Sequence, residues 1–217
     1  MTPDAFVAAA AAIGADLSGE QVRLCTVYHD LLWAWSARTR LVSRGDRAHL
    51  WDRHLLDSLA SAQFIQEPSG RLLDLGSGAG LPGIVLKIAL PDAVVTLLEP
   101  ARMKALFLRE AISQLGLAGV GVLRARAESL ASDAAHAASY DTVTARAVAP
   151  LPTVWAWAHP LLRAGGRLVA FKPPGSLVEL GPVLPRGMDA VERILHLPGA
   201  PRPRGFALLR SASPQAP

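Results

Sequence analysis

The chain has 217 residues, of which 51% are hydrophobic and 18% charged, with a formal net charge of +4 at pH 7. This balance excludes a disordered chain and favours one domain with a sizeable core, while the single cysteine, Cys25, excludes a disulfide framework and a cysteine-rich metal site. No apolar run reaches the ~18 residues of a membrane span and the alanine-rich start lacks a basic leader segment, so we expect a cytoplasmic protein without a membrane partner or a metal.

Residues 4–64 are expected to be helical. Ser18 and Gln21 form the pattern of a capping box, and apolar residues follow them at helical spacing. A polar, basic loop is expected at about 38–46. A second helix is expected over 47–64, again with apolar residues on one face.

Arginine outnumbers acidic residues between positions 23 and 54. Such an excess suits contact with phosphate groups, and it suits a solvated helix face equally well. The turn at 67–70 marks a boundary between two parts of the chain. The expected organisation is a helical extension over 1–68, a core over 69–211 and a frayed tail over 212–217.

Strands and helices alternate after residue 70, which is typical of βαβ units and a parallel sheet. Strands are expected at 71–75, 93–98, 119–123, 141–145 and 167–171. Helices are expected at about 81–90, 101–116 and 150–163. The end of the chain predicts a hairpin of two further strands, at 189–197 and 205–210.

The segment 71–83 is the most informative part of the sequence. A strand-like run carries one acid, Asp74, and then breaks into Gly76, Gly78 and Gly80 before a helical pattern resumes. Glycines at a strand-to-helix turn allow a positive φ and a close approach of the backbone to a ligand. Open α/β sheets bind nucleotides at such turns, so this segment predicts a nucleotide-type cofactor.

Two cofactors compete for this turn. Gly78 to Gly83 satisfies the dinucleotide pattern G-x-G-x-x-G, and Glu99 stands where that pattern expects a ribose-binding acid. However, the strand closes at Gly76 with Asp74 just before it, and a carboxylate there would repel a pyrophosphate. It would accept hydrogen bonds from an ammonium instead, which favours S-adenosyl-L-methionine.

Charged residues follow three further strands at the expected carboxyl edge of the sheet. Asp74 would hold the ammonium directly or through water, and Glu99 would accept both ribose hydroxyls. Ala127 and Glu128 stand in a loop that can flank an adenine. Arg146 closes the fourth strand, where it would orient a base or form an ion pair that shapes the pocket.

The chain resembles the bacterial small-subunit ribosomal RNA guanine-N7 methyltransferases, also called glucose-inhibited division protein B, over roughly residues 20–210. The segments that carry the resemblance are Arg53-His54-Leu55-Leu56-Asp57-Ser58, Asp74 to Gly83 with its Leu81-Pro82-Gly83 ending, and Arg146-Ala147; Lys104 and Lys172 also fit. Arg40 departs from the pattern, since the family usually has Asn there.

The resemblance implies a Rossmann-like class I S-adenosylmethionine methyltransferase, a seven-stranded doubly wound α/β sheet with an N-terminal helical cap. It implies methylation of guanine N7 in 16S ribosomal RNA, in a loop near the decoding centre, by a monomeric enzyme acting on the RNA or the small subunit. The implied cofactor-binding or site-lining residues are Gly76, Leu81, Ala127, Glu128 and Arg146.

The catalytic residue is expected to be Arg146, which would orient the guanine through O6 or a nearby phosphate; an ion pair with Glu128 or Asp57 is the alternative. Arg53, His54, Lys104 and Lys172 would frame an RNA entrance, with His54 a hydrogen-bonding residue or phosphate contact rather than a base. The alternatives are a dinucleotide-dependent oxidoreductase, the same fold acting on another substrate, and a non-catalytic RNA-binding module.

Overall fold

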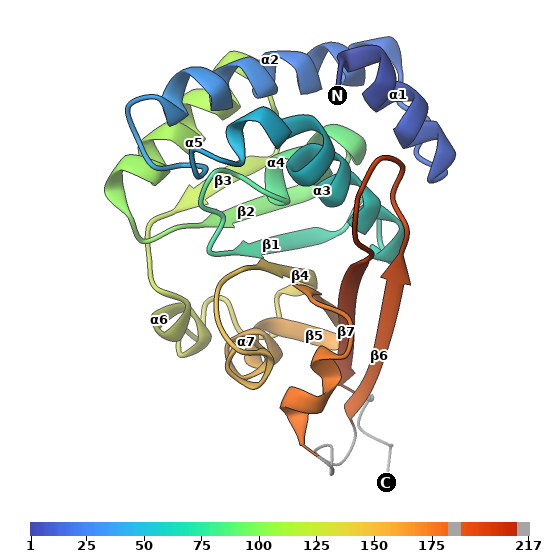
Figure 1. Cartoon of the computed structure of the whole chain (residues 1–217). Coiled ribbons are helices and arrows are strands. Elements are labelled where there is room, and N and C mark those ends of the chain that lie inside the picture. The colour runs from blue at the N-terminus through green and yellow to red at the C-terminus, as the bar shows by residue number, and fades with distance from the viewer. Residues whose placement is uncertain (182–187, 212–217) are drawn as a thin grey trace, which may run out of the picture.

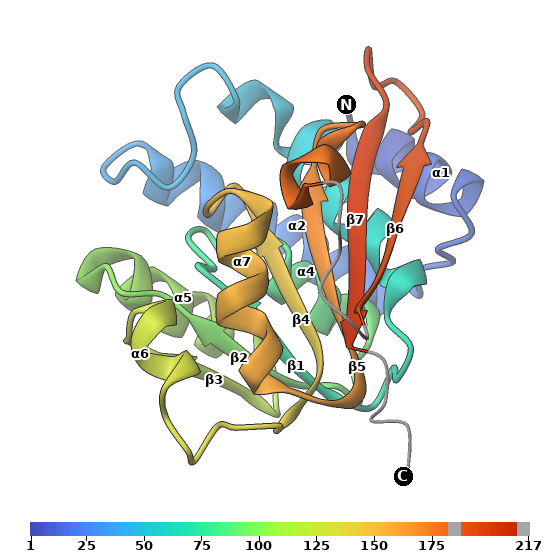
Figure 2. The ribbon, with the colours of Figure 1, turned by 90° about the horizontal axis from the view of Figure 1, so that it is seen from below.

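A computed structural model describes residues 1–181 and 188–211, and its centre is a seven-stranded sheet (Figures 1 and 2). The strand order is β3-β2-β1-β4-β5-β7-β6. The first five strands are parallel, whereas β7 runs antiparallel to both β5 and β6. The strands are β1 (Arg71–Leu75), β2 (Val94–Leu98), β3 (Val120–Leu123), β4 (Tyr140–Arg146), β5 (Leu162–Lys172), β6 (Met188–Leu195) and β7 (Arg204–Ser211).

Helices cover both faces of this sheet, as a doubly wound fold requires (Figure 1). One face packs against the first five helices and the other against the last two. The helices are α1 (Pro3–Ala12), α2 (Gly19–Ser36), α3 (Leu56–Ala60), α4 (Gly83–Ala89), α5 (Arg102–Leu115), α6 (Ala127–Ala131) and α7 (Leu151–Ala158). The predicted fold class and strand count are confirmed.

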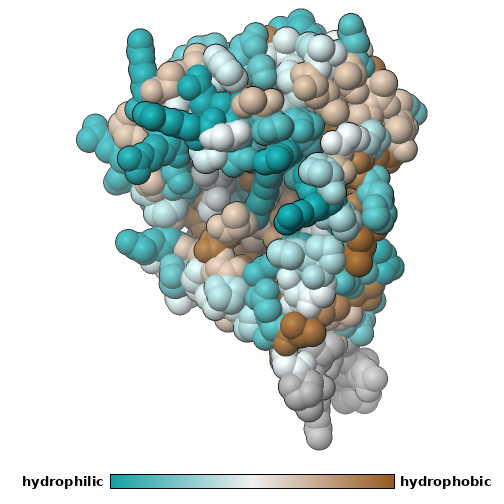
Figure 3. Space-filling view, viewed as in Figure 1, coloured by the Kyte–Doolittle hydropathy of each residue, from teal (hydrophilic) through white to brown (hydrophobic). Residues whose placement is uncertain are grey.

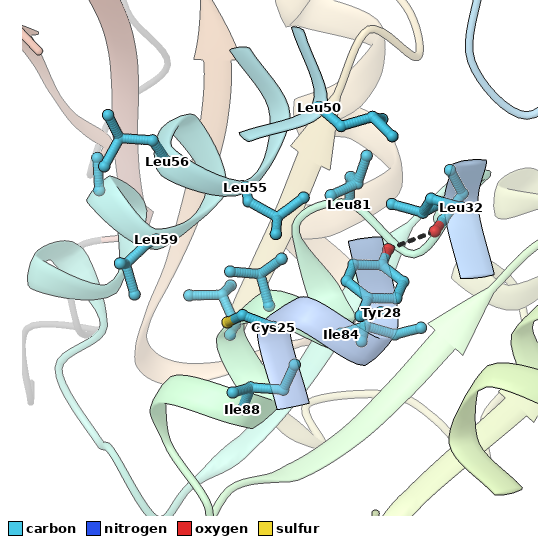
Figure 4. Close-up of a cluster of buried hydrophobic side chains, with 14 of the residues drawn as sticks. Cys25, Tyr28, Leu32, Leu50, Leu55, Leu56, Leu59, Leu81, Ile84 and Ile88 are labelled. Carbon is cyan, nitrogen blue, oxygen red and sulfur yellow. Dashed lines mark hydrogen bonds between the residues drawn. The ribbon is translucent and has the colours of Figure 1, made fainter. Parts of the chain in front are cut away.

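The N-terminal helices pack directly on the glycine turn that follows β1. The predicted capping box is present, with Ser18 and Gln21 bonded to each other's backbone amides. Helix α2 then buries Cys25, Tyr28 and Leu32 among leucines and isoleucines of the segments around α3 and α4 (Figure 4). The Tyr28 hydroxyl donates a 2.5 Å hydrogen bond to the carbonyl of Ala79 (Figure 4). The helical cap therefore fixes the turn from outside the sheet.

Several element boundaries differ from those expected. The predicted helix over 47–64 is a succession of 3₁₀ (47–49), π (50–55), α (56–60) and 3₁₀ (61–64) turns. The helix expected from residue 81 begins at Gly83, with Pro82 as its N-cap. Ala127 and Glu128, expected in a loop, form the first turn of α6. The tail predicted over 212–217 lies outside the described residues.

The strand order reverses between β1 and β4. From β1 the chain runs outward through β2 and β3, and it then returns to place β4 on the other side of β1. In open α/β sheets, ligands bind at the carboxyl ends of the strands at such a reversal. Asp74 on β1 pairs in register with Thr144 on β4, so both residues lie close to this edge.

Candidate active site

The turn after β1 depends on glycine for two different reasons. Gly76, Gly78 and Gly80 all have a positive φ, between 56° and 84°, which L side chains rarely adopt. Gly83 has an ordinary φ, but a Cβ there would lie 2.4 Å from Leu97 Cδ2 and 2.8 Å from Asp74 Oδ2. The first three glycines thus shape the turn, whereas Gly83 allows α4 to approach the sheet closely.

Asp74 is fully buried and its carboxylate is occupied by the protein itself. Its Oδ1 accepts a 2.7 Å hydrogen bond from the Thr144 hydroxyl, and its Oδ2 accepts one from the Gly83 amide at 3.2 Å. Burial raises the pKa of Asp74 to about 6, against the opposing effect of these hydrogen bonds. In this arrangement Asp74 ties β1, β4 and α4 together beneath the turn.

Glu99 follows β2 and holds two backbone amides. Its Oε2 accepts from the Gly78 amide at 2.9 Å, and its Oε1 accepts from the Ala101 amide at 2.8 Å. A carboxylate has about four acceptor positions, so one on each oxygen remains free. The Glu99 side chain therefore braces the glycine turn and still presents acceptors at the strand edge.

A cavity of about 300 Å³ lies beside this carboxylate. Its wall comes from the ends of four strands and includes Gly76, Glu99, Ala127 and Glu128, together with Trp157 of α7. Asp74, Gly78, Gly80 and Leu81 do not line it. We call this space the acidic cavity, because Glu99 and Glu128 are part of its wall.

Arg146, at the end of β4, reaches into the helical cap. Its Nη2 donates to the carbonyl of Arg53 and to Nδ1 of His54, both at 2.9 Å, and its Nη1 lies 3.4 Å from Ser58 Oγ. Because a guanidinium can only donate, His54 is the neutral tautomer with its proton on Nε2. Burial and the Arg146 charge lower the pKa of His54 to about 4. His54 is thus a structural acceptor for Arg146.

Asp57 connects Arg146 to a second arginine. Both carboxylate oxygens of Asp57 accept from Nε of Arg204 at 2.8 Å, and Arg146 Nη2 lies 3.9 Å away. The predicted ion pair of Arg146 is therefore formed with Asp57. Burial raises the pKa of Asp57, while the Arg204 hydrogen bond and the Arg146 charge oppose this rise.

A larger cavity of about 710 Å³ opens next to these three side chains. Val154, Phe171 and three prolines make much of its wall apolar, and three arginines and one lysine add positive charge: Arg146, Arg202, Arg204 and Lys172. It shares Ala147 and Val148 with the acidic cavity. We call it the apolar cavity. The segment after β4 is thus a common wall between two adjoining spaces.

The four residues predicted to frame an RNA entrance are not gathered at one place. Lys172 lines the apolar cavity and bonds to the Ala149 carbonyl and Glu179. Arg53 borders a neighbouring cavity with Arg202 and Arg204, and it pairs with Asp46 at 3.3 Å. His54 is held by Arg146, and Lys104 lies on α5, outside both cavities.

One face of the molecule has a recess within a mostly hydrophilic surface (Figure 3). Figure 3 shows a recess near the centre of one face, with hydrophobic side chains inside it and hydrophilic ones above it. The basic segment between α2 and α3 projects from the same side of the molecule (Figure 1), and Arg38, Arg40 and Arg44 line a hollow there. This combination of an apolar recess and a basic rim suits a nucleotide base and its phosphates.

Sequence reasoning missed the role of two residues at the site. Trp157 has no motif, and only its place on α7 brings it to the acidic cavity. Arg204 lies 147 positions from Asp57, and the pairing of β7 with β5 brings the two together. A basic residue at the start of the last predicted strand was the sole available signal.

Comparison with known proteins identifies the family. The family described as rRNA small subunit methyltransferase G (GidB) matches residues 21–181. The chain belongs to this family. The resemblance inferred from its motifs is confirmed, and the dinucleotide interpretation of the glycine turn finds no support.

Curated relatives carry the same description. One from Rubrobacter xylanophilus is 46% identical over 162 residues, covering 73% of this chain and 61% of the relative. One from Roseiflexus sp. (strain RS-1) is 37% identical over 220 residues, covering 97% of this chain and 92% of the relative. Both are named ribosomal RNA small subunit methyltransferase G. The chain thus spans a little under two thirds of the first relative and most of the second.

Solved structures agree on the fold. A protein from Agrobacterium tumefaciens, described as a predicted O-methyltransferase, has a TM-score of 0.55 at 24% identity, covering 70% of this chain and 79% of its own. A mutant of MtNAS in complex with S-adenosylmethionine has a TM-score of 0.58 at 18% identity, covering 83% of this chain and 72% of its own. At these identities the likeness concerns the Rossmann-like α/β fold alone.

Two further properties of the described residues concern membrane and metal binding. Among residues 1–181 and 188–211, no helix combines the length and the apolar character needed to cross a bilayer. In the same residues, His, Cys, Asp and Glu side chains do not gather in threes around a point that could hold a metal ion.

Proposed function

We propose that this protein transfers the methyl group of S-adenosyl-L-methionine to N7 of a guanine in 16S ribosomal RNA, in the loop near the decoding centre. One observation carries the proposal: an acidic cavity and an apolar cavity adjoin at the carboxyl ends of the strands and share the wall formed by Ala147 and Val148. Two cavities of 300–1,000 Å³ side by side suit two organic ligands that exchange a group.

The acidic cavity fits the cofactor better than it fits a dinucleotide. Glu99 keeps free acceptors for the ribose hydroxyls, and Ala127 leaves room for the adenine ring. Glu99 and Glu128 give the wall two carboxylates against the single cation of Arg126, so its net negative charge disfavours a pyrophosphate. The cofactor supplies an electrophilic methyl group on a positively charged sulfur, and Gly76 lets its methionine part approach the backbone.

Asp74 does not line the acidic cavity and would affect the cofactor only indirectly. Because Thr144 and Gly83 occupy its oxygens, we propose that it fixes the turn rather than holding the ammonium directly. Gly78 and Gly80 contribute through their positive φ, and Leu81 through its packing beneath the turn. These residues position the cofactor site without forming its surface.

The apolar cavity suits the purine ring of the substrate. Guanine N7 carries an exposed lone pair, so its attack on a methyl group requires no base to remove a proton. The protein then acts by alignment and electrostatics. Arg146 fits this role, because four contacts with the helical cap fix its guanidinium at the edge of the cavity.

The RNA would reach the site across the basic rim. Lys172 lines the apolar cavity, and Arg53 borders the neighbouring cavity that Arg202 and Arg204 also line. Lys104 and the 38–46 segment lie outside these two cavities. His54 would act through Arg146 rather than on the RNA. A ribosomal substrate implies a cytoplasmic location, and we propose that the enzyme acts as a monomer.

The test is methyl transfer by the purified protein. Small ribosomal subunits from cells that lack the protein are incubated with S-adenosyl-L-methionine labelled in its methyl group. Borohydride reduction and strand cleavage then locate N7-methylguanine in the RNA. We expect one labelled guanine in the loop near the decoding centre; label at another atom, or none on subunits or free RNA, would contradict the proposal.

A further inference from the structure

Asp57 is the one acidic side chain among the described residues that line the apolar cavity. It lies on α3, in the helical cap, whereas the arginines beside it come from the end of β4 and the start of β7. Its side chain is 9% exposed, and it forms part of the cavity wall. A buried carboxylate is costly unless it is paired and hydrogen-bonded.

The charge around Asp57 keeps it ionised. Burial favours the protonated acid, but Arg204 donates to both oxygens and Arg146 stands 3.9 Å away. A single N–H of Arg204 is shared between the two oxygens, and the Arg146 distance exceeds that of a hydrogen bond. The carboxylate therefore retains acceptor positions for a ligand.

The edges of guanine differ in a way that matches this carboxylate. N1–H and the N2 amino group are adjacent donors on one edge, whereas O6 and N7 are acceptors on another. A carboxylate can accept from both donors side by side. When it does so, N7 remains free for the reaction. Adenine has a bare N1 and no N2 amino group, so it would leave the carboxylate unpaired.

We propose that Asp57 selects guanine by accepting hydrogen bonds from N1–H and the N2 amino group of the base in the apolar cavity. The proposal rests on the proposed function, because it assumes that the apolar cavity takes the target base. Asp57 is then a specificity-determining residue, and Arg146 and Arg204 are the counter-charges that keep it ionised and in place.

The experiment measures the affinity of nucleoside monophosphates for the protein saturated with S-adenosylhomocysteine. The probes are GMP, 1-methyl-GMP, IMP, which lacks the N2 amino group, and AMP. Saturation-transfer NMR at millimolar concentrations gives each dissociation constant. We expect IMP and 1-methyl-GMP to bind about tenfold more weakly than GMP, and AMP at least about a hundredfold more weakly.

Two variants separate base recognition from a purely structural role. Asp57→Asn removes the charge, and we expect the preference for GMP over IMP to fall from about tenfold to less than about twofold. Arg204→Gln removes one of the two counter-charges but leaves the carboxylate beside Arg146, so we expect a smaller loss of the preference than in Asp57→Asn. Asp189→Asn, in an exposed ion pair with Arg210, is the surface control and changes nothing.

Equal binding of GMP and IMP by the wild-type protein would overturn the inference, as would the absence of GMP binding. Loss of the preference in Arg204→Gln to the same degree as in Asp57→Asn would assign Asp57 a positioning role instead. The wild-type series of analogues remains decisive if Asp57→Asn does not fold. Failure of the wild-type protein to methylate small subunits would instead contradict the proposed function itself.

Discussion

The acidic cavity and the apolar cavity differ in how the chain builds them. The acidic cavity is small, about 300 Å³, and it is shaped by a glycine turn and by residues that follow successive parallel strands. The apolar cavity is more than twice as large, about 710 Å³, and its charged residues come from α3, the ends of β4 and β5, and the segment that leads into the antiparallel strand β7. The lining of the first lies within residues 76–157, whereas that of the second spans residues 57–205.

This difference matches the two tasks of a methyltransferase. A cofactor site can be made from strand-end residues because the parallel sheet delivers them to one edge. The proposed substrate site is instead lined by segments around the sheet, here the helical cap and the start of β7. Changes in the two regions should therefore separate cofactor affinity from methyl transfer.

Arg146→Ala should have the largest effect. The guanidinium lines the apolar cavity and not the acidic one, so methyl transfer to small subunits should fall about 100- to 1,000-fold. S-adenosyl-L-methionine affinity, measured by calorimetry, should change less than about threefold, since no Arg146 contact reaches Glu99. Arg163→Ala is the matched control, because Arg163 pairs with Asp141 and Glu67 away from both cavities. Unchanged turnover in Arg146→Ala would remove this residue from the mechanism.

Glu99→Gln should lower the affinity for the cofactor and leave the affinity for the base unchanged. The substitution leaves one amide oxygen where two carboxylate oxygens accept from Gly78 and Ala101, and it weakens the acceptors left for ribose. Cofactor affinity should fall about 10- to 100-fold, the value of one or two hydrogen bonds to a charged group. The affinity for GMP should stay the same. Glu110→Gln, exposed on α5, is the control; a cofactor affinity that survives Glu99→Gln would contradict the assignment of the acidic cavity.

Two glycine substitutions, one near each cavity, test whether the two cavities can be disturbed separately. A Cβ on Gly83 would meet Leu97 and Asp74 below the acidic cavity, and one on Gly205 would lie 2.3 Å from the Lys172 carbonyl oxygen beside the apolar cavity. Each Gly→Ala change should lower the free energy of unfolding by about 1–3 kcal/mol, measured in urea. Gly83→Ala should also weaken cofactor binding, and Gly205→Ala should weaken GMP binding instead. Gly121→Ala, at a site with open space, is the control; identical profiles for the first two would show that the cavities are not separable.

The smallest effect concerns pH. The pKa of His54 is lowered to about 4, so its contribution to stability is present above pH 6.5 and is lost as the pH falls towards 4. The pKa of Asp74 is raised to about 6, so its contribution is present below pH 3.8 and is lost as the pH rises through 6. The two slopes have opposite signs, and the free energy of unfolding should change by no more than about 1 kcal/mol between pH 4.5 and 6.5.

Variants that lack one of the two groups should show the pH dependence of the free energy of unfolding that the other group causes. In His54→Gln the free energy of unfolding should fall as the pH rises across this window, because the Asp74 slope remains. In Asp74→Asn it should rise, because the His54 slope remains. Urea unfolding at several pH values measures both. Slopes of the same sign in the two variants would contradict the assigned pKa directions.

The strand-edge position of the proposed cofactor site could be predicted from sequence, because its signals lie in short segments next to the predicted strands. Asp74 lies near the end of one apolar run and the glycines and Glu99 follow such runs, which are typical of buried strands, and the strand order brings these residues to one edge. The resemblance to the family likewise rested on short segments. One feature of this region could not be predicted. The carboxylate of Asp74 accepts hydrogen bonds from Thr144 and Gly83, and no spacing in the sequence indicates these contacts.

The substrate side could be predicted only in part. Arg146 was expected at the edge, and its ion pair with Asp57 was one of two alternatives, but the bond from Arg204 depends on how β7 packs beside β5. The irregular turns over 47–64 also escaped prediction, since their residues have ordinary helical spacing. Long-range pairing in the folded chain, rather than local preference, decides these features.

The central claim is that the protein methylates guanine N7 in small-subunit ribosomal RNA, with the cofactor in the acidic cavity and the base in the apolar cavity. The most direct test maps N7-methylguanine in 16S ribosomal RNA from cells with the protein, cells without it, and cells that carry only Arg146→Ala. We predict a modified guanine in the loop near the decoding centre in the first case, and an unmodified one in the second and third. The account would be contradicted if this guanine were modified in cells without the protein. It would also be contradicted if the guanine were unmodified in cells with the protein.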